Sequence, residues 1–383
     1  MITPNPQKNN QMKANIKISI YDQQINFLKY IERRSYQFKG GPKNNPLLPL
    51  YSINKSDIIL PKEGGTKPEN DICIKLSSSI ANKTDRKPVN CVKFFSDSKK
   101  VLFGTTIGNL IIYNIYNNNT NNIELTPYYK FDPNISIRAI QFSKDESFLL
   151  TGDKNGNVNY FKEPNQQNPK KIIHNIQIHN DTITDISFSI NSQKFVTSSD
   201  DKTSKIMDFF SGKNELIFKE HLGDVKSCNW NPYRNIIATG SKDQFVKIWD
   251  PNSGDVIGSL HIHKNSINRL RFNQNGNWLL SGSKDHTVKV SDIRMMKELQ
   301  IFKGHDSEVN TLCWHPIHEE IFCSAGADKK IIHWKVGEDK NYIYQNAHDK
   351  EIFDLQYNKT GTVLASGGND AFLNIWTRAP LIQ

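Results

Sequence analysis

The second half of this chain repeats itself with a period of about forty-two residues. Five copies begin with a histidine, at His179, His221, His263, His305 and His348, in steps of 42, 42, 42 and 43 residues. An aspartate follows each histidine by 22 or 23 positions, at Asp201, Asp243, Asp285, Asp328 and Asp370. Six positions further on comes a slot that holds Met207, Trp249, Ser291, Trp334 or Trp376. One unit of this length cannot bury its apolar face alone, so the copies must pack against one another.

The repeat predicts an all-β fold, a seven-bladed β-propeller. A period of forty to forty-five residues that ends near Trp-Asp is typical of a propeller blade. Each copy also holds short runs rich in Val, Ile, Phe and Trp between Gly, Asn and Asp turns. Two worn copies without the histidine lie upstream, one with Tyr113 and one with Phe161 in the tryptophan slot; Asn155 takes the aspartate slot of the latter. Seven copies then fill about residues 87–378.

The ring needs one strand from outside the repeats. The chain ends seven residues after Trp376, which is too short for the outermost strand of the last blade. We expect residues 71–81 to supply it, with Ile72, Ile74 and Leu76 alternating with polar residues, because pairing both ends of the ring removes an exposed edge. The predicted propeller domain is therefore 71–383. We interpret the Asn-rich stretch 114–122 as a loop between the first two blades.

The repeated histidines and aspartates are predicted to brace the blades and not to catalyse. A catalytic centre occurs once in a domain, whereas this pair recurs five times around a ring. An aspartate in a tight turn can accept backbone N–H bonds, and histidine and tryptophan can donate side-chain N–H groups. We assign this structural role to His179, Asp201, His221, Asp243, Trp249, His263, Asp285, His305, Asp328, Trp334, His348, Asp370 and Trp376.

The sequence predicts no enzyme, cofactor or metal site. It has no G-x-S-x-G, H-E-x-x-H, P-loop or G-x-G-x-x-G motif. Cys313, His315, His318 and Cys323 lie close in sequence, but their spacing fits no standard zinc pattern. No run of eighteen apolar residues could span a membrane, and MITPNPQKNNQMKANIK lacks the apolar centre of a secretory signal. We expect a soluble, intracellular protein.

Residues 1–70 are predicted to form a basic arm outside the propeller. Residues 1–50 carry eight lysines and arginines against two acids, a net charge of +6 out of +10 for the whole chain. Ile25, Leu28 and Ile31 have the spacing of one short helix, and a Pro- and Gly-rich segment follows. A basic arm on a rigid ring fits nucleic-acid binding. It fits equally the Lys- and Asn-rich composition of the whole chain.

Several stretches resemble one known family. HIHKNSINRLRFNQNGNWLLSGSKDHTVKVSDIR, LQIFKGHDSEVNTLCWHPIHEEIFCSAGAD, HWKVG and NIWTR are similar to the WD-repeat subunit of the cleavage and polyadenylation specificity factor. YIERR (30–34), NNP (44–46) and KLSSSIANKTDRKP match it outside the repeats, so the resemblance covers about residues 12–378. It implies a nuclear, RNA-binding scaffold subunit that helps recognise the AAUAAA signal of pre-mRNA. The implied partners are a large multi-propeller scaffold subunit and a zinc-finger subunit.

The resemblance also implies which residues contact RNA. Met12-Lys13 matches part of a basic cluster of the family, Asn82-Lys83 matches a pair before blade one, and Arg138 matches an arginine of blade two. The expected RNA-binding residues, with the nearest aromatic residues to the family's base-stacking position, are Lys13, Lys17, Asn82, Lys83, Tyr128, Tyr129 and Arg138. The basic neighbours of Lys13 are missing, which predicts fewer released counterions and weaker RNA binding than is usual in the family.

A protein-interaction adaptor that does not bind RNA is the alternative function. Residues 291–294, SDIR, resemble the Trp-Asp-x-Arg signature of ubiquitin-ligase substrate receptors, with Ser291 in place of the tryptophan. We expect no homo-oligomer under either function.

Overall fold

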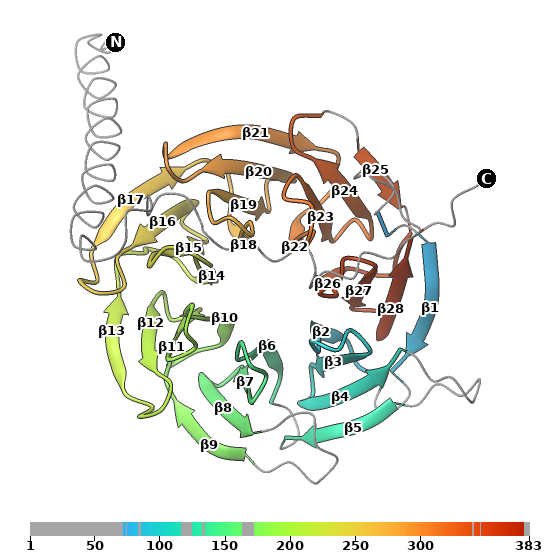
Figure 1. The fold of residues 1–383 in the computed structure, drawn as a ribbon, viewed down its shortest axis with the longest axis horizontal. Coiled ribbons are helices and arrows are strands. Elements are labelled where there is room, and N and C mark those ends of the chain that lie inside the picture. The colour runs from blue at the N-terminus through green and yellow to red at the C-terminus, as the bar shows by residue number, and fades with distance from the viewer. Residues whose placement is uncertain are drawn as a thin grey trace, which may run out of the picture.

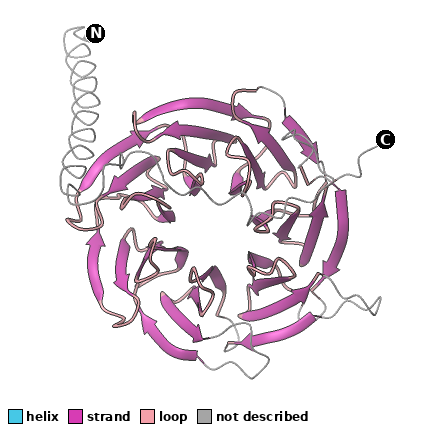
Figure 2. Ribbon diagram, in the orientation of Figure 1, coloured by secondary structure: helices cyan, strands magenta, loops and turns pink. Residues whose placement is uncertain are grey.

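In the computed structural model the chain forms a ring of seven four-stranded antiparallel sheets (Figure 1). The structure describes residues 72–73, 75–82, 86–115, 125–131, 135–162, 172–338, 341–344 and 346–378. Every regular element in these ranges is a strand (Figure 2), and they contain no helix that could cross a membrane. The predicted all-β, seven-bladed propeller is confirmed. The predicted basic arm, residues 1–70, lies outside the described residues.

Each blade is a meander whose first strand lies nearest the centre of the ring and whose fourth lies at its rim (Figure 1). The first three blades are β2 (Val89–Phe94), β3 (Lys100–Thr105), β4 (Asn109–Asn114) and β5 (Leu125–Lys130); β6 (Ile137–Phe142), β7 (Phe148–Asp153), β8 (Asn157–Lys162) and β9 (Ile172–Gln177); and β10 (Ile183–Phe188), β11 (Lys194–Ser199), β12 (Ser204–Asp208) and β13 (Asn214–Phe218).

Blades four to seven repeat this order. They are β14 (Val225–Trp230), β15 (Ile237–Ser241), β16 (Phe245–Trp249) and β17 (Val256–His261); β18 (Ile267–Phe272), β19 (Trp278–Ser283), β20 (Thr287–Asp292) and β21 (Lys297–Lys303); β22 (Val309–Trp314), β23 (Ile321–Gly326), β24 (Ile331–Lys335) and β25 (Asn341–Tyr344); and β26 (Ile352–Tyr357), β27 (Val363–Gly368) and β28 (Phe372–Thr377), completed by β1 (Lys75–Ala81).

β1 closes the ring by pairing antiparallel with β28, at the place in the chain where the sequence predicted it. The predicted apolar face of residues 72–76 holds for Ile72, which is 7% exposed and precedes β1, and is wrong for Leu76. A β-bulge shifts the register between Leu76 and Ser78, so Ile80 is 1% exposed and Leu76 is 37% exposed. A bulge adds one residue to a strand and thereby reverses the faces that simple alternation assigns. Ile74 lies outside the described residues.

Two details of the worn copies also differ from the prediction. β4 and β5 pair in one sheet, so the Asn-rich stretch joins two strands of blade one and does not join two blades. Residues 116–124 of that stretch lie outside the described residues. In blade two the turn carboxylate is Asp153: its Oδ1 accepts the backbone N–H groups of Asn155 (2.8 Å) and Asn157 (2.9 Å). Asn155 holds the predicted slot, but the carboxylate comes two positions earlier.

Apolar side chains fill the space between neighbouring blades. Leu150 and Val158 of blade two, for example, pack in one buried cluster with Ile183 and Phe195 of blade three. Each square ångström of apolar surface removed from water contributes roughly 25 cal/mol. A blade therefore gains most of its stability from its two neighbours and not from its own hairpins.

The turn between the second and third strands places one residue in the left-handed region. Its φ lies between 65° and 88° at Gly108, Gly156, Lys202, Gln244, His286, Lys329 and Ala371. Only the first two blades use glycine, which adopts this backbone without steric cost. In the other five blades a side chain is held in this conformation directly after the slot aspartate.

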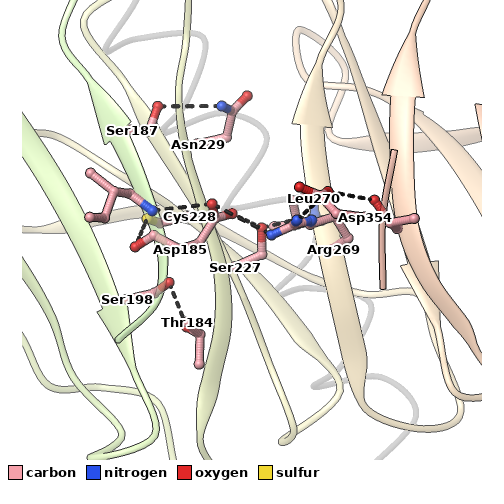
Figure 3. A network of polar contacts seen from close by, with 12 residues as sticks. Thr184, Asp185, Ser187, Ser198, Ser227, Cys228, Asn229, Arg269, Leu270 and Asp354 are labelled. Atoms are coloured by element: carbon pink, nitrogen blue, oxygen red, sulfur yellow. Dashed lines mark hydrogen bonds and ion pairs between the residues drawn. The ribbon is translucent and has the colours of Figure 1, made fainter. Parts of the chain in front are cut away.

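A buried ion-pair network crosses the centre of the ring (Figure 3). Arg269 of β18 donates through Nη2 to Asp354 Oδ1 of β26 at 2.7 Å. Its Nη1 lies 3.6 Å from Asp185 Oδ1 of β10. Arg271, two residues along β18, donates through Nη1 to Asp185 Oδ2 at 2.8 Å. The network therefore connects blades three, five and seven, which are not neighbours in the ring.

Neighbouring blades satisfy the remaining oxygens of the two aspartates. Asp354 accepts the Val92 N–H of blade one (3.0 Å) and the Thr311 hydroxyl of blade six (3.1 Å). Asp185 accepts the Ser227 hydroxyl of blade four at 2.7 Å. Buried charges are stable only when paired and hydrogen-bonded in this way. Six of the seven blades thus contribute to one polar centre.

Replacement of Ile80 by aspartate tests the closing strand. We expect Ile80→Asp to lower the free energy of unfolding by about 3–5 kcal/mol, because it buries an unpaired charge at the β1–β28 seam. Leu76→Asp is the matched control in the same strand and should cost less than about 1 kcal/mol. Urea unfolding followed by tryptophan fluorescence measures both. Equal losses for the two variants would contradict the assigned faces of β1.

Candidate nucleic-acid interface

The five histidine–aspartate pairs make the same contact in every blade from the third to the seventh. The Nδ1 atom of each histidine lies 2.8–2.9 Å from a carboxylate oxygen of its aspartate. The Nε2 atom lies 2.7–2.8 Å from a hydroxyl of the second strand, at Thr197, Thr239, Ser281, Ser324 or Ser366. Both ring nitrogens are engaged, so none of these histidines is available for acid–base chemistry on a substrate.

The tryptophan slot extends this chain of contacts in three blades. Trp249 Nε1 donates to the Thr239 hydroxyl at 2.7 Å, and Trp334 and Trp376 donate to the corresponding serines at 2.8 and 2.9 Å. The indole therefore contacts the hydroxyl that faces the histidine, and not the aspartate. Where Ser291 replaces the tryptophan, its Oγ is buried without a hydrogen-bond partner.

The turn aspartates are held ionised. Asp243 accepts the backbone N–H groups of Leu222 and Phe245, both at 3.0 Å. Burial opposes ionisation of its carboxyl group, but the hydrogen bond and charge of His221 outweigh burial and lower the pKa of Asp243 to about 2. The same balance between burial and the paired histidine lowers the pKa of Asp201, Asp285, Asp328 and Asp370. The ionised form is therefore part of the folded state.

The described residues hold no group of three or more His, Cys, Asp or Glu side chains that could bind a metal ion. Cys313 and Cys323 are cross-strand neighbours, and His315 Nε2 is 3.2 Å from the Gly361 carbonyl. The five cysteines are free thiols, and burial raises the pKa of the Cys313 and Cys323 thiols. These side chains fill the space between blades six and seven.

The strand registers bring part of the predicted RNA site to one face of the ring. We call the face that carries the histidine–aspartate turns the histidine face; first and third strands begin there, and second and fourth strands end there. Arg138 is the second residue of β6, Tyr129 is the last but one of β5, and Asn82 directly follows β1. Residues from blades seven, one and two therefore meet at this face.

The predicted RNA-binding residues differ in how far they are buried. Asn82 is 2% exposed; its Nδ2 donates to the Lys87 carbonyl, and its own carbonyl accepts the Arg86 N–H. This side chain shapes the entry to blade one. Arg138 is exposed. Lys13, Lys17 and Lys83 lie outside the described residues.

The two tyrosines pack against blade two. Tyr128 is 6% exposed, and its ring lies edge-on to Phe161 with centroids 5.8 Å apart. It offers no open ring face for a base, which contradicts the predicted stacking role. Tyr129 is half-buried against Phe131 and Phe161. The outer strand of blade one faces the core of the next blade, and sequence alone did not show which tyrosine this covers.

Three further cations that the sequence did not single out lie on the same face as Arg138. Arg86, Lys130 and Lys154 lie with it on the histidine face of blades one and two, and we call these four residues the basic sector. All four are exposed, and none forms an ion pair with another described residue. The nearby carboxylate of Asp153 is buried and bonded to its own turn. Alignment of the worn copies with the regular ones, loop by loop, would have placed these cations on one face.

On the histidine face of the other blades, cations are mixed with acids, and some of them are paired. Lys226 lies 2.7 Å from Asp200 and 3.1 Å from Asp224, and Lys284 lies 2.9 Å from Glu308. Exposed lysines without an ion pair, such as Lys202 and Lys264, share that face with exposed acids such as Asp181 and Asp349. Among the described residues, blades one and two hold no exposed acid at this face, so a phosphate backbone would meet the least compensated positive charge there.

Five segments of the chain, residues 170–208, 212–250, 254–292, 296–335 and 340–377, match the family described as WD domain, G-beta repeat. The chain belongs to the WD-repeat family. Blade one and the first three strands of blade two precede the matched segments.

Two fungal relatives of this WD-repeat chain are both named polyadenylation factor subunit 2. The Candida albicans protein is 30% identical over 338 residues, which cover 81% of this chain and 60% of the relative. The Neurospora crassa protein is 30% identical over 224 residues, which cover 58% of this chain and 32% of the relative. This chain thus spans about 60% or less of the length of these relatives.

A solved structure supports the fold alone. The WD40 β-propeller domain of Doa1 superposes with a TM-score of 0.68 at 19% sequence identity, and the match covers 80% of this chain and 97% of that domain.

The lowered pKa of Asp243 predicts acid sensitivity. A carboxylate with a depressed folded-state pKa stabilises the fold fully above about pH 4 and loses that contribution as the pH falls toward its folded pKa of about 2. Asp243→Asn should therefore lower the free energy of unfolding by about 2 kcal/mol at pH 7, and the difference from the parent should shrink below pH 4.

Urea unfolding between pH 7 and pH 2.5 measures this difference. Asp255→Asn is the matched control, since Asp255 is an exposed aspartate of the same blade. A constant difference between parent and Asp243→Asn over this pH range would show that the carboxylate is not stabilised as described.

Proposed function

We propose that this chain is a WD-repeat subunit of the nuclear machinery that processes mRNA 3′ ends, and that it binds RNA at the basic sector. The observation that carries the proposal is the set of four exposed, unpaired cations on blades one and two of the histidine face. The similarity to proteins named polyadenylation factor subunit 2 supports the biological setting.

The sector suits a single-stranded ligand. Four cations on neighbouring blades can follow a phosphate backbone, and each neutralised phosphate releases condensed counterions. Arginine can also stack on a base, which gives Arg86 and Arg138 a second mode of contact. Lys83 directly follows Asn82 in the sequence and would add charge beside the sector.

The finer proposal concerns the RNA sequence. We propose that the chain helps to hold AAUAAA together with a zinc-finger subunit, bound to a large multi-propeller scaffold subunit. The role is binding and positioning without catalysis. This is consistent with histidines whose ring nitrogens are both engaged in structural contacts.

Charge reversal tests the RNA site. The triple variant Arg86→Glu, Lys130→Glu, Lys154→Glu should bind a fluorescein-labelled AAUAAA oligonucleotide at least about tenfold more weakly in the presence of the zinc-finger subunit. The slope of log K against log salt should fall by roughly 2, since three phosphate contacts are lost. Fluorescence anisotropy measures both. Lys13→Ala with Lys83→Ala should act in the same direction.

The matched control reverses three exposed lysines at the opposite face: Lys99→Glu, Lys144→Glu, Lys359→Glu. Equal losses for both triple variants would mean that only net charge matters and that the basic sector is not the site. Equal binding of AAUAAA and AAGAAA would contradict signal recognition and would favour the adaptor function.

A further inference from the structure

The face opposite the histidine face has a polar opening, which we call the mouth. A cavity of about 550 Å³ lies there among the turns that follow the innermost strands of six blades. This volume is typical of ligand sites, which measure ~300–1,000 Å³. Trp230, Trp314 and Phe94 form part of its walls, and Lys144 and Lys359 lie at its rim.

The fifth residues of the seven innermost strands form a ring at the level of this mouth. They are two cations (Lys93, Arg271), three amides (Gln141, Asn229, Gln356), a serine and a cysteine. No carboxylate is among them. The carboxylates of Asp185 and Asp354 belong to the next ring inward, the third residues, and are bonded to Arg271 and Arg269 there.

Two of the three amide oxygens of this ring are already used. Gln356 Oε1 accepts the Phe94 N–H at 2.8 Å, and Asn229 Oδ1 accepts the Phe272 N–H at 2.8 Å. These amide oxygens are thus tied to the neighbouring blade, and what these side chains can offer a ligand is their NH₂ groups. Two further donors in the lining, Trp230 Nε1 and Asn273 Nδ2, are buried without a hydrogen-bond partner.

Lys93 adds a basic group to this ring, directly before the lining residue Phe94. The centre of the ring holds three cations, Lys93, Arg269 and Arg271, against the two aspartates. The ammonium group of Lys93 has no hydrogen-bond or ion-pair partner among the described residues. Burial, and then the nearby charge of Arg271, lower the pKa of Lys93. The one acid in the lining, Glu146, is bonded to the Ser96 hydroxyl and N–H.

We propose that this mouth binds a carboxylate-bearing peptide segment of a partner protein, inserted end-on so that an Asp or Glu side chain meets Lys93 and the amide donors. A ring with two cations, unpartnered donors beside it and no carboxylate favours an anion, and aromatic walls suit a neighbouring apolar side chain. An RNA strand fits less well, because the donors lie inside a mouth enclosed by six blades and not along an open track. The site is independent of the basic sector, which lies at the other face.

A pair of labelled peptides tests the proposal on the full chain. Asp-Glu-Trp-Glu-Asp should bind about tenfold or more tightly than Asn-Gln-Trp-Gln-Asn in fluorescence anisotropy, since a charge-assisted hydrogen bond is lost with each carboxylate. Lys93→Gln should reduce binding of the acidic peptide about tenfold. Lys350→Gln, an exposed lysine at the histidine face outside the basic sector, is the matched control and should leave it unchanged.

If Lys93→Gln impairs folding, a double variant of two lysines at the rim of the mouth tests the same site. Lys144→Gln with Lys359→Gln changes only exposed side chains and should weaken the acidic peptide at low salt. Equal binding of the two peptides, or no loss in a folded Lys93→Gln variant, overturns the site. Displacement of the peptide by an RNA oligonucleotide overturns the choice of peptide as ligand. None of these results depends on the AAUAAA experiment, so the two proposals fail separately.

Discussion

Closure of the ring is the constraint on which this structure depends. Each blade buries its apolar surface against two neighbours, so a missing contact between the last and first blades would expose two faces at once. β1 prevents this by pairing with β28 from the other end of the sequence. The Arg269 network adds a constraint across the centre, because one guanidinium contacts aspartates of two blades on opposite sides of its own. The apolar contacts between neighbouring blades and the ion pairs across the centre together define the diameter of the ring.

That geometry separates two kinds of chemistry. The histidine face carries exposed cations over blades one and two, while the opposite mouth carries donors enclosed by six blades. Between them lies a layer of paired charges, Asp185, Asp354 and Arg269, with every formal charge compensated by a hydrogen-bonded partner. A ligand at one face therefore meets different groups from a ligand at the other. One small ring can in this way serve as a platform for two partners.

Much of the fold could be predicted from the sequence because it repeats. The forty-two-residue period predicted the number of blades. The missing outer strand of the last repeat predicted that a segment before the first repeat closes the ring. The faces of β1 could not be predicted, because a bulge at Leu76 has no signature in a polar strand. The RNA-binding site was harder to predict than the fold. Asn82 and Tyr128 match by position but are buried, and Arg86, Lys130 and Lys154 come to one face only through the order of the strands. Surface charge depends on which cations find partners, and this is a property of three dimensions.

Blades one and two lack the histidine–aspartate contact, and blade one packs against blade seven, which β1 completes. Blades one and two are held by apolar packing, by glycine at the turn and, in blade two, by Asp153. This part of the circle has the fewest internal braces, so hydrogen exchange should be fastest there if local opening begins at the least supported blades. A polyanion bound across blades seven, one and two would contact both sides of the ring closure. A ligand that binds only the closed ring stabilises it by linkage. Its binding free energy would therefore oppose separation of β1 from β28.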